Sequence, residues 1–352
     1  MHIHNKNKEV IHKYRKGLYD LNVEKLESHI NTYVAADAEL HIAHPFEAIH
    51  GSQELYERVY RPLTEAIPDL ERRDYIVMAG NGKEGDLAGN WIGCAGFYTG
   101  IFARPWLDIP PTGHPVAMRF HEFYQVEGER IVAMQALWDI PQIMMQAKAW
   151  PMTPSLGVEW LTPGPATQDG IITADYDAEK AATSYQLIMD MLTGLQRHKD
   201  EGAEAMGLEQ YWHPKMLWYG PAGIGTNRRI SGFRNWHQIP FLKAMPDREG
   251  SVKGNPTGIL FADHDYVAVT GWPNMTMTIS GDGWLGIPPV DKSITMRSLD
   301  FWRCENGLIR ENWVLVDLLH VYHQLGVDVF SRMRELSYPR QSKHYFIADD
   351  IF

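Results

Sequence analysis

A repeated hexapeptide divides this chain into two similar halves. The segment Trp106–Pro111 (WLDIPP) recurs as Trp284–Pro289 (WLGIPP), an offset of 284 − 106 = 178 residues. The same offset pairs further identical residues without a gap: Met118-Arg119 with Met296-Arg297, Phe123 with Phe301, Glu127 with Glu305, Ile131 with Ile309, Asp139 with Asp317 and Gln146 with Gln324. Self-similarity at a fixed period marks a duplicated architecture. Because this period is as long as a domain, it predicts two copies of one domain and not a solenoid.

Composition narrows the classes of function. The formal net charge of −11 argues against binding to nucleic acid or to anionic membranes, since both need many positive charges. We found no apolar stretch long enough to cross a membrane and no apolar signal region at the N-terminus, which predicts a cytoplasmic protein without a membrane partner. Cys94 and Cys304 are not at equivalent repeat positions and have no zinc-ligand spacing, so we expect two reduced thiols, no metal and no cofactor.

Each half follows the same plan, with helices first and strands afterwards. Apolar residues recur at helical spacing and then change to period two or to short apolar runs. The predicted helices are 10–31, 51–66, 179–198 and 233–244, and the predicted strands are 75–78, 87–102, 116–126, 131–140, 258–261, 266–272, 275–280, 293–303 and 308–317. This order predicts an α+β fold in which helices cover one face of a mostly antiparallel sheet. We expect domains at 1–150 and 175–336, a linker at 151–174 rich in Pro and Gly, and a C-terminal tail at 337–352.

The last strand of each half carries an aspartate at its end. Period two places Asp317 on one face with Trp313 and Leu315, and the same parity groups Asp139 with Leu137. Burial raises the pKa of such a carboxyl toward neutrality, as a general acid or base requires. Alternatively, each aspartate caps the helix that follows it. One carboxylate can do both.

These residues resemble a known family. A strand ending in Trp313 and Asp317, followed by Gln324-Leu325-Gly326 and preceded by a Glu-Asn-Gly turn, resembles the SnoaL-like polyketide cyclases of the nuclear-transport-factor-two-like superfamily, whose fold ketosteroid isomerase shares. The resemblance covers residues 10–150 and 178–335. It implies cone-shaped α+β barrel domains packed as a pseudo-dimer. It also implies that Asp317, and Asp139 with a less complete match, act as acid/base catalysts without metal or cofactor.

Histidines gather in the first half, close to the segment that precedes the second helix. His44 or His41 could form an acid/base pair with Asp139, because imidazole titrates near neutral pH. The alternatives are ordinary surface or core histidines, or ligands of a metal, which would need a third ligand from elsewhere. His121 belongs to the same polar set, which makes the first half the favoured place for chemistry.

Aromatic and basic residues complete the candidate substrate site. Trp218 and Tyr219 suit an apolar planar ligand or a packed loop, and Trp138 and Trp313 join them on the last strands. Arg119, like its repeat equivalent Arg297, could bind an anionic oxygen of the substrate. The other reading pairs these arginines with Glu122 and Asp300.

Three functions fit this pattern. The first is a cofactor-independent acid/base enzyme of the cyclase or isomerase kind, acting on a small hydrophobic carbonyl compound. The second is a hydrolase or lyase that uses the same pocket. The third is a non-catalytic carrier of a small ligand, or a scaffold. In each case the partner is a small hydrophobic molecule, and the chain could also form a homo-oligomer.

Overall fold

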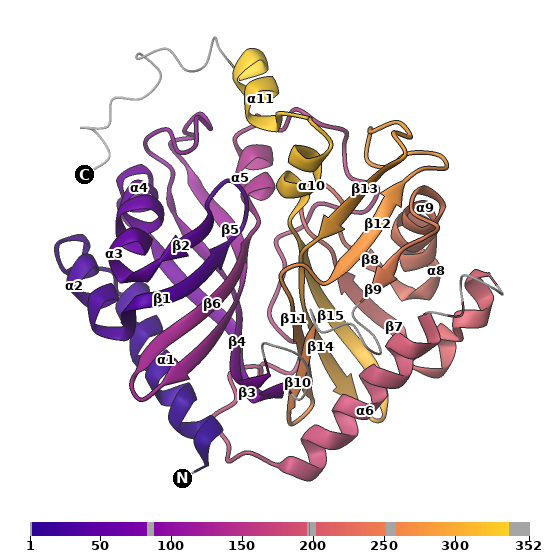
Figure 1. Ribbon diagram of the computed structural model, residues 1–352, viewed down its shortest axis with the longest axis horizontal. Coiled ribbons are helices and arrows are strands. Elements are labelled where there is room, and N and C mark those ends of the chain that lie inside the picture. The colour runs from indigo at the N-terminus through magenta and orange to yellow at the C-terminus, as the bar shows by residue number, and fades with distance from the viewer. Residues whose placement is uncertain (1, 83–87, 196, 198–201, 251–257, 338–352) are drawn as a thin grey trace.

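Two lobes lie side by side, each with a sheet toward the other lobe and helices on its outer side (Figure 1). The computed structural model describes residues 2–82, 88–195, 197, 202–250 and 258–337. The first lobe extends from α1 to α5 and the second from α6 to α11. This arrangement confirms the predicted fold of two tandem α+β domains packed as a pseudo-dimer through their sheets.

The first lobe wraps its helices around a six-stranded sheet. Its elements are α1 (Ile3–Tyr19), α2 (Val23–Tyr33), β1 (Val34–Ile42), β2 (Glu47–His50), α3 (Gly51–Leu55), η1 (Tyr56–Tyr60), α4 (Arg61–Ala66), β3 (Glu71–Gly82), β4 (Gly89–Ile101), β5 (Pro115–Glu127), β6 (Arg130–Trp138) and α5 (Ile140–Gln146). The strand order is β2-β1-β6-β5-β4-β3. Within this sheet β1 and β6 run parallel and the other neighbours run antiparallel. The mostly antiparallel sheet that the sequence predicted is therefore confirmed.

The second lobe repeats this order with shorter strands. Its elements are α6 (Ala178–Leu195), η2 (Ala203–Met206), η3 (Leu208–Gln210), β7 (Trp212–Tyr219), β8 (Asn227–Arg228), α8 (Arg229–Phe233), η4 (Arg234–Gln238), α9 (Ile239–Ala244), β9 (Glu249–Gly250), β10 (Ile259–Asp263), β11 (Tyr266–Thr270), β12 (Met275–Ile279), β13 (Lys292–Met296), β14 (Ser298–Glu305), β15 (Leu308–Val316), α10 (Leu318–Gln324) and α11 (Val329–Ser337). Its main sheet, β8-β7-β15-β14-β11-β10, matches the first, and β13-β12-β9 form a separate small sheet. Among the described residues neither main sheet closes into a barrel, so each lobe is an open cone.

The repeated WLxIPP segments form the same turn in both lobes. Trp106 pairs with Ile109 across one turn, and Trp284 pairs with Ile287 across the other. Their central residues have positive φ, including Asp108 at 62° and Gly286 at 79°. This left-handed conformation favours glycine and tolerates Asp or Asn. The repeated segment therefore forms a rigid turn beside the core of each lobe.

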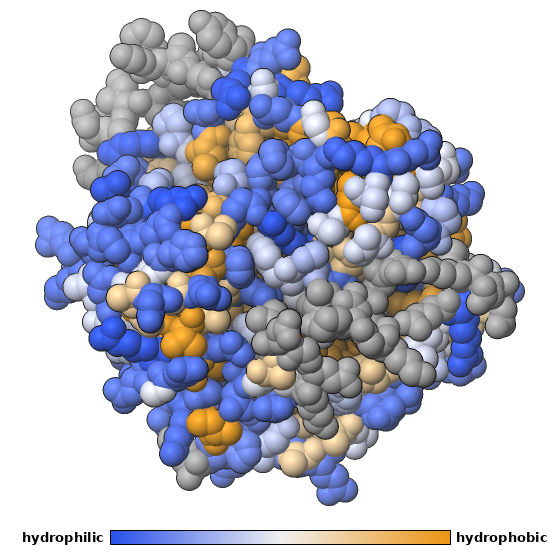
Figure 2. Space-filling model, viewed as in Figure 1, coloured by the Kyte–Doolittle hydropathy of each residue, from blue (hydrophilic) through white to orange (hydrophobic). Residues whose placement is uncertain are grey.

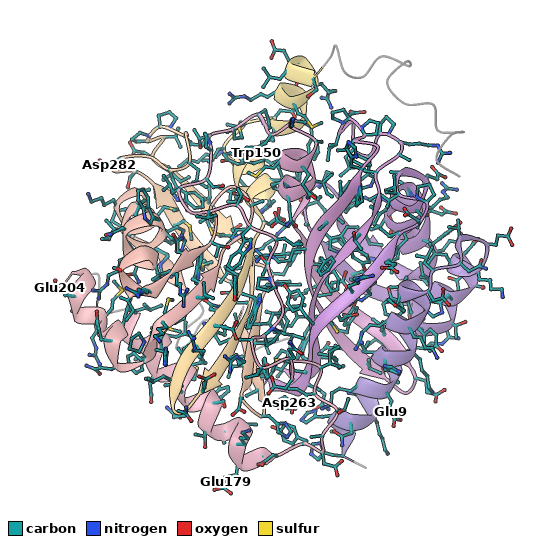
Figure 3. The ribbon with its side chains drawn as sticks, turned by 180° about the vertical axis from the view of Figure 1, so that it is seen from behind. Glu9, Trp150, Glu179, Glu204, Asp263 and Asp282 are labelled. Carbon is teal, nitrogen blue, oxygen red and sulfur yellow. The ribbon has the colours of Figure 1, made fainter. Side chains whose placement is uncertain are left out.

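Both faces of each sheet are buried, and period two assigns the side chains to two environments. One face packs under the helices, and the other packs against the opposite lobe. The second contact, which we call the seam, contains these buried apolar residues: Ala43, Ile76, Met78, Trp91, Ala95, Phe123, Leu137, Ile172, Tyr219, Ile259, Phe261, Tyr266, Ala268, Leu299, Phe301, Trp313 and Leu315. Asp263 closes one end of the seam, where it accepts hydrogen bonds from Lys8 and from the Ala79 amide of the first lobe (Figure 3).

The seam has the symmetry of a homodimer interface. Phe123 stacks on Phe301 with ring centroids 5.0 Å apart, and the imidazole of His121 lies 2.6 Å from the carbonyl oxygen of Leu299. In each pair the two positions differ by 178, the offset of the repeat. A two-fold interface places equivalent residues against each other in this way, so the duplication has joined the two halves of a dimer in one chain.

Three segments predicted from the sequence lie partly or wholly outside the described residues. The predicted strand 87–102 begins outside them, and the predicted helix 179–198 ends outside them, while α6 itself is described to Leu195. The predicted tail lies outside them beyond Ser337. Between α5 and α6 the chain forms only isolated bridges, at Val158 and Ile171. No helix among the described residues is long and apolar enough to span a membrane, and the visible face is mainly hydrophilic with scattered apolar patches (Figure 2).

Candidate active site

Asp139 and Asp317 lie at the seam, where each accepts a hydrogen bond from the other lobe. Asp139 Oδ2 accepts from the Ala222 amide at 2.9 Å, and Asp317 Oδ2 accepts from the His44 amide at 3.0 Å. Residues 44 and 222 also differ by 178, so the two contacts are equivalent. The two aspartates therefore join the lobes at matched positions.

Burial shifts the pKa of both aspartates upward. Burial raises the pKa of Asp139 to about 6, and the positive charge of Arg119 opposes that rise. Burial also raises the pKa of Asp317, against the charge of Arg297. Each aspartate precedes a helix, and Asp317 Oδ1 caps α10 by accepting from the His320 amide at 3.1 Å. Both the raised pKa and the capping role are present in the same residue.

The matched arginines hold the seam as well. Arg119 donates to four oxygens at 2.8–3.1 Å: Thr162 Oγ1 and the carbonyls of Tyr219, Gly220 and Val314. Arg297 donates to Asp317 at 3.1 Å and to Glu47 at 2.7 Å. The predicted pairing of these arginines with Glu122 and Asp300 is wrong, because strand parity points the arginines into the seam and the two acids away from it.

The predicted pairing of a histidine with Asp139 is also wrong. His44 lies beside Asp317, with its ring stacked on His323 and its Nδ1 3.0 Å from Glu47. His41 stacks on Trp272 of the second lobe. The prediction assumed that the histidine and the aspartate belong to the same lobe. In the structure, each loop that precedes the second helix crosses the seam and contacts the aspartate of the other lobe. No three metal-binding side chains converge within the described ranges.

The predicted substrate-binding residues fall into two separate places. Tyr219 and Trp313 stack on each other at the seam, with ring centroids 5.3 Å apart. His121 is buried there too, and burial lowers its pKa well below the usual value. By contrast, Trp138 and Trp218 lie on the faces under the helices. Trp218 stacks on His237 at 4.1 Å, and Trp138 Nε1 donates to Glu122 at 2.8 Å.

The helix-covered faces carry a second matched pair of acids. Glu122 and Asp300 differ by 178 and occupy the same register position in the two sheets. Glu122 lies between Cys94 and Ala136 on the neighbouring strands. Asp300 lies between Val269 and Val314. Each lobe therefore places a carboxyl at the same position of its helix-covered, concave face.

In the first lobe this carboxyl is fully neutralised by protein groups. Glu122 forms a buried ion pair with Arg72 and accepts from Tyr98 at 3.1 Å, from Tyr124, and from Trp138 at 2.8 Å. The guanidinium of Arg72 also binds Asp74 at 2.9 Å and lies 4.2 Å above the ring of Phe120.

The rest of that interior is occupied by tyrosines. Tyr60 links Tyr98 at 3.0 Å to Tyr14 at 3.3 Å, and all three are fully buried. Burial raises the pKa of each of these hydroxyls well above the usual value, so they remain protonated. Side chains thus fill the place where a ligand of the first lobe would sit.

In the second lobe the matched carboxyl has no such partners. Asp300 is partly exposed, and among the described residues its only hydrogen-bond donor is the Ser298 hydroxyl at 2.7 Å. Desolvation by the surrounding apolar side chains raises the pKa of Asp300 to about 7, while the Ser298 bond and the more distant charge of Arg119 oppose the rise. A carboxyl with this pKa can both donate and accept a proton near neutral pH.

Unpaired polar atoms lie on the same face as Asp300. Asn227, Trp218, Asn312 and Trp302 stand opposite one another on successive strands, in the row next to Asp300. In the described part of the chain, four buried nitrogens of this face have no hydrogen-bond partner: Trp212 Nε1, Asn227 Nδ2, His237 Nδ1 and Trp302 Nε1. Buried polar groups normally have partners, so these nitrogens are available to bind a water molecule or a ligand.

Sequence reasoning missed Asp300 as a site residue because it followed the aspartates that are identical in both halves. The signal was present in the same alignment of the two halves, in which the acidic residue Glu122 is aligned with the acidic residue Asp300. Strand parity then separates that pair from Asp139 and Asp317. Neither observation reveals which face the helices cover, since that depends on the tertiary packing.

Comparison with known proteins identifies the domain that is repeated. A model of the family described as SnoaL-like polyketide cyclase matches residues 13–147 and 195–325. A solved protein of Jannaschia sp. CCS1, described as a SnoaL-like polyketide cyclase, is 16% identical with a TM-score of 0.35, over 41% of this chain and 93% of that one. A SnoaL-like polyketide cyclase of Agrobacterium tumefaciens strain C58 is 19% identical with a TM-score of 0.30, over 39% of this chain and 94% of that one.

A third solved structure is similar to the same extent. An NTF2-like protein of Burkholderia thailandensis E264 is 15% identical with a TM-score of 0.31, over 40% of this chain and 96% of that one. A search of curated proteins found no match. Because the family model matches both halves and more than half of the sequence, the chain belongs to the SnoaL-like polyketide cyclase family, with two copies of the family's domain in tandem.

Proposed function

We propose that this protein is a cofactor-independent acid/base enzyme acting on a small hydrophobic carbonyl compound, and that the reaction takes place on the concave face of the second lobe. Asp300 carries this proposal. It is a partly exposed carboxyl with a pKa raised to about 7, and no described cation forms an ion pair with it. A general acid/base works best when its pKa is close to the working pH.

The surroundings of Asp300 suit the proton transfers of a cyclase or isomerase. In such reactions a base takes a proton from the carbon next to a carbonyl, and negative charge develops on the carbonyl oxygen. The unpaired N–H groups of Trp302 and Trp212 are neutral donors that can stabilise this oxygen, as donors aimed at developing charge do. The stacked rings of Trp218 and His237 provide an apolar wall for a flat substrate.

The first lobe fits a supporting role in this proposal. Its matched carboxyl, Glu122, is held by Arg72, and tyrosines fill its interior. The catalytic roles expected for Asp139, Asp317 and His44 remain predictions. Their position at the seam, each with a backbone or protein partner, supports joining of the lobes and favours Asp300 as the reacting group.

Substitution of the acids separates these assignments. On a panel of hydrophobic ketones and aldehydes, we expect Asp300→Asn to lower kcat/KM by roughly a hundredfold or more, the usual size of a lost acid/base group. Asp139→Asn is the matched control, and we expect it to keep activity within a few-fold at a temperature where it stays folded. Wild-type turnover by Asp300→Asn would refute the proposal, and loss of turnover in folded Asp139→Asn would favour the seam aspartates.

The pH profile provides a second test of the same residue. Ser298 donates to Asp300 and thereby stabilises its charged form. We expect Ser298→Ala to raise the pKa of Asp300 further and to move the corresponding limb of the pH–rate profile to higher pH. An unchanged profile would mean that this limb belongs to another group.

A further inference from the structure

A positively charged cleft opens on the outside of the first lobe, away from Asp300. It lies between α1 and β3 and has a volume of about 400 Å³. Its lining residues are His12, Arg15, Lys16, Tyr19, Arg72, Arg73 and Asp74. Four of these seven are arginine or lysine and one is acidic, in a chain whose net charge is −11. Three acids in contact with these arginines (Asp74, Glu71 and Glu122) balance most of this charge and leave a small positive excess, which attracts negatively charged ligands.

Two nitrogen-bearing side chains of this cleft are free of partners among the described residues. Within the described ranges, the ammonium of Lys16 and the imidazole of His12 have no ion-pair or hydrogen-bond partner, and both side chains are exposed. One helical turn separates the two residues, so they lie on the same side of α1. Two nitrogen donors with no partner therefore stand on one wall of the cleft.

The floor of the cleft is fixed by ion pairs. Asp74 accepts from Arg15 Nε at 2.9 Å and from Arg72 at 2.9 Å, so one carboxylate holds two guanidinium groups. Arg73 on the opposite wall pairs with Glu71 at 2.7 Å. Arg72 is also paired with Glu122 from the interior, so each of the three arginines of the cleft has an acid partner. Among the described residues, the unpaired positive charge of the cleft is therefore that of Lys16.

An aromatic ring completes the cleft. Tyr19 ends α1 and is 53% exposed, so its ring is available for a contact. Its ring offers a flat surface within the lining of a cleft whose other groups are mainly cationic. An anion attached to an aromatic ring satisfies both features at once.

We infer that this cleft binds a small anionic molecule in which a phosphate or carboxylate group is attached to an aromatic ring. The anionic group binds Lys16, His12 and Arg15, and the ring lies against Tyr19. The site is independent of the acid/base chemistry proposed for the second lobe, since Asp300 belongs to the other sheet.

Calorimetric titration with defined probes tests the inference on the full-length protein. Phenyl phosphate, benzoate and inorganic phosphate are titrated separately at low ionic strength. We expect saturable binding of phenyl phosphate or benzoate, and the tighter of the two identifies the anionic group. We expect inorganic phosphate to bind more weakly than phenyl phosphate, because it lacks the ring. We also expect Tyr19→Ala to reduce the advantage of phenyl phosphate over inorganic phosphate.

A neighbouring lysine provides the matched control. Lys13 is exposed on the same helix but does not line the cleft. We expect Lys16→Ala to weaken binding about tenfold, the usual effect of one lost charge-assisted hydrogen bond, and Lys13→Ala to have little effect. Equal weakening by both variants would show non-specific attraction and would overturn the inference, as would the absence of saturable binding. Unchanged binding by Asp300→Asn would separate this site from the active site.

Discussion

The matched carboxyls of the two lobes should respond to neutralisation with opposite changes in stability. Glu122→Gln and Asp300→Asn each replace one carboxylate oxygen by an amide nitrogen at equivalent positions of the two sheets. The first substitution removes the anion of a buried ion pair, whereas the second removes an anion that has no ion-pair partner within the described part of the chain. Stability measurements need no substrate, so this prediction tests the electrostatic basis of the proposed site directly.

The cost in the first lobe follows from the partners of Glu122. The side chain accepts from Arg72, Tyr98, Tyr124 and Trp138, and the Glu122 and Arg72 side chains are fully buried. A glutamine keeps one acceptor oxygen but places an NH2 group against donors. Breaking a buried pair by removing one charge costs about 3–5 kcal/mol. Because Asp74 still holds Arg72, we expect Glu122→Gln to lose about 3 kcal/mol.

The gain in the second lobe follows from the pKa of Asp300. Its pKa is raised from the usual value of 3.8 to about 7, so at pH 8 the ionised form is costly in the folded state. At 1.36 kcal/mol per pH unit the upper limit is about 4 kcal/mol, which solvent screening reduces because Asp300 is partly exposed. Loss of the Ser298 hydrogen bond subtracts about 1 kcal/mol. We therefore expect Asp300→Asn to stabilise the protein by about 1–2 kcal/mol at pH 8.

The pH dependence fixes the sign of this effect. A carboxyl with a raised folded-state pKa costs nothing below its unfolded pKa near 3.8, and its cost grows until the pH passes the folded pKa near 7. The difference between Asp300→Asn and wild type should therefore be small or reversed at pH 5, and should reach its full favourable value at pH 8.

Urea unfolding at pH 5 and pH 8 measures both effects, with intrinsic tryptophan fluorescence as the signal. We compare the midpoint of the first transition, because two lobes need not unfold in one step. A destabilised Asp300→Asn at pH 8 would refute the reasoning, since it would mean that the carboxylate has a favourable partner. A Glu122→Gln variant as stable as wild type would likewise contradict the closed network of the first lobe.

Two further predictions concern the seam and the repeated turn. Asp139→Asn and Asp317→Asn should each lower the free energy of unfolding at pH 5 by about 1–3 kcal/mol, because the new NH2 group cannot accept the N–H groups that the carboxylate binds across the seam, and denaturant midpoints of the two variants check this. Gly286→Ala should cost roughly 2 kcal/mol in the same assay, because φ is +79° and the new Cβ would lie 2.5 Å from the side chain of Thr153. Gly307→Ala is its control, with φ of +75° and no neighbour within 4 Å of the new Cβ, and should cost only the backbone strain of about 1 kcal/mol. Equal losses at the two glycines would mean that the close contact relaxes without cost.

The repeat made most of the architecture predictable from the sequence. One offset of 178 residues gave the number of domains, the equivalent strands and the pairing of lobes, because a two-fold interface brings equivalent residues together. Strand parity correctly grouped Trp313 and Leu315 with Asp317. Parity alone does not say whether that group faces the helices or the other lobe, and here it faces the other lobe.

The contacts on the helix-covered faces were harder to predict, because the side chains that meet there come from distant segments of the chain. Arg72 on β3 reaches Glu122 on β5, and the tyrosines of that network come from α1, η1, β4 and β5. No local pattern links these positions. No described residue places a cation beside Asp300, and the sequence does not reveal this either, since it depends on the side chains of the neighbouring strands.

Fusion of two copies in one chain explains how such an asymmetry can exist. In a homodimer every substitution occurs twice, so a change that fills one pocket fills both. In this chain Arg72 closes the first interior, while the equivalent carboxyl Asp300 has no ion-pair partner among the described residues. The first lobe can then stabilise the shared seam, through Arg119 and the His44 amide, without loss of the second interior. We infer that the duplication separated support from chemistry, and opposite responses at Glu122 and Asp300 are the signature that this separation requires.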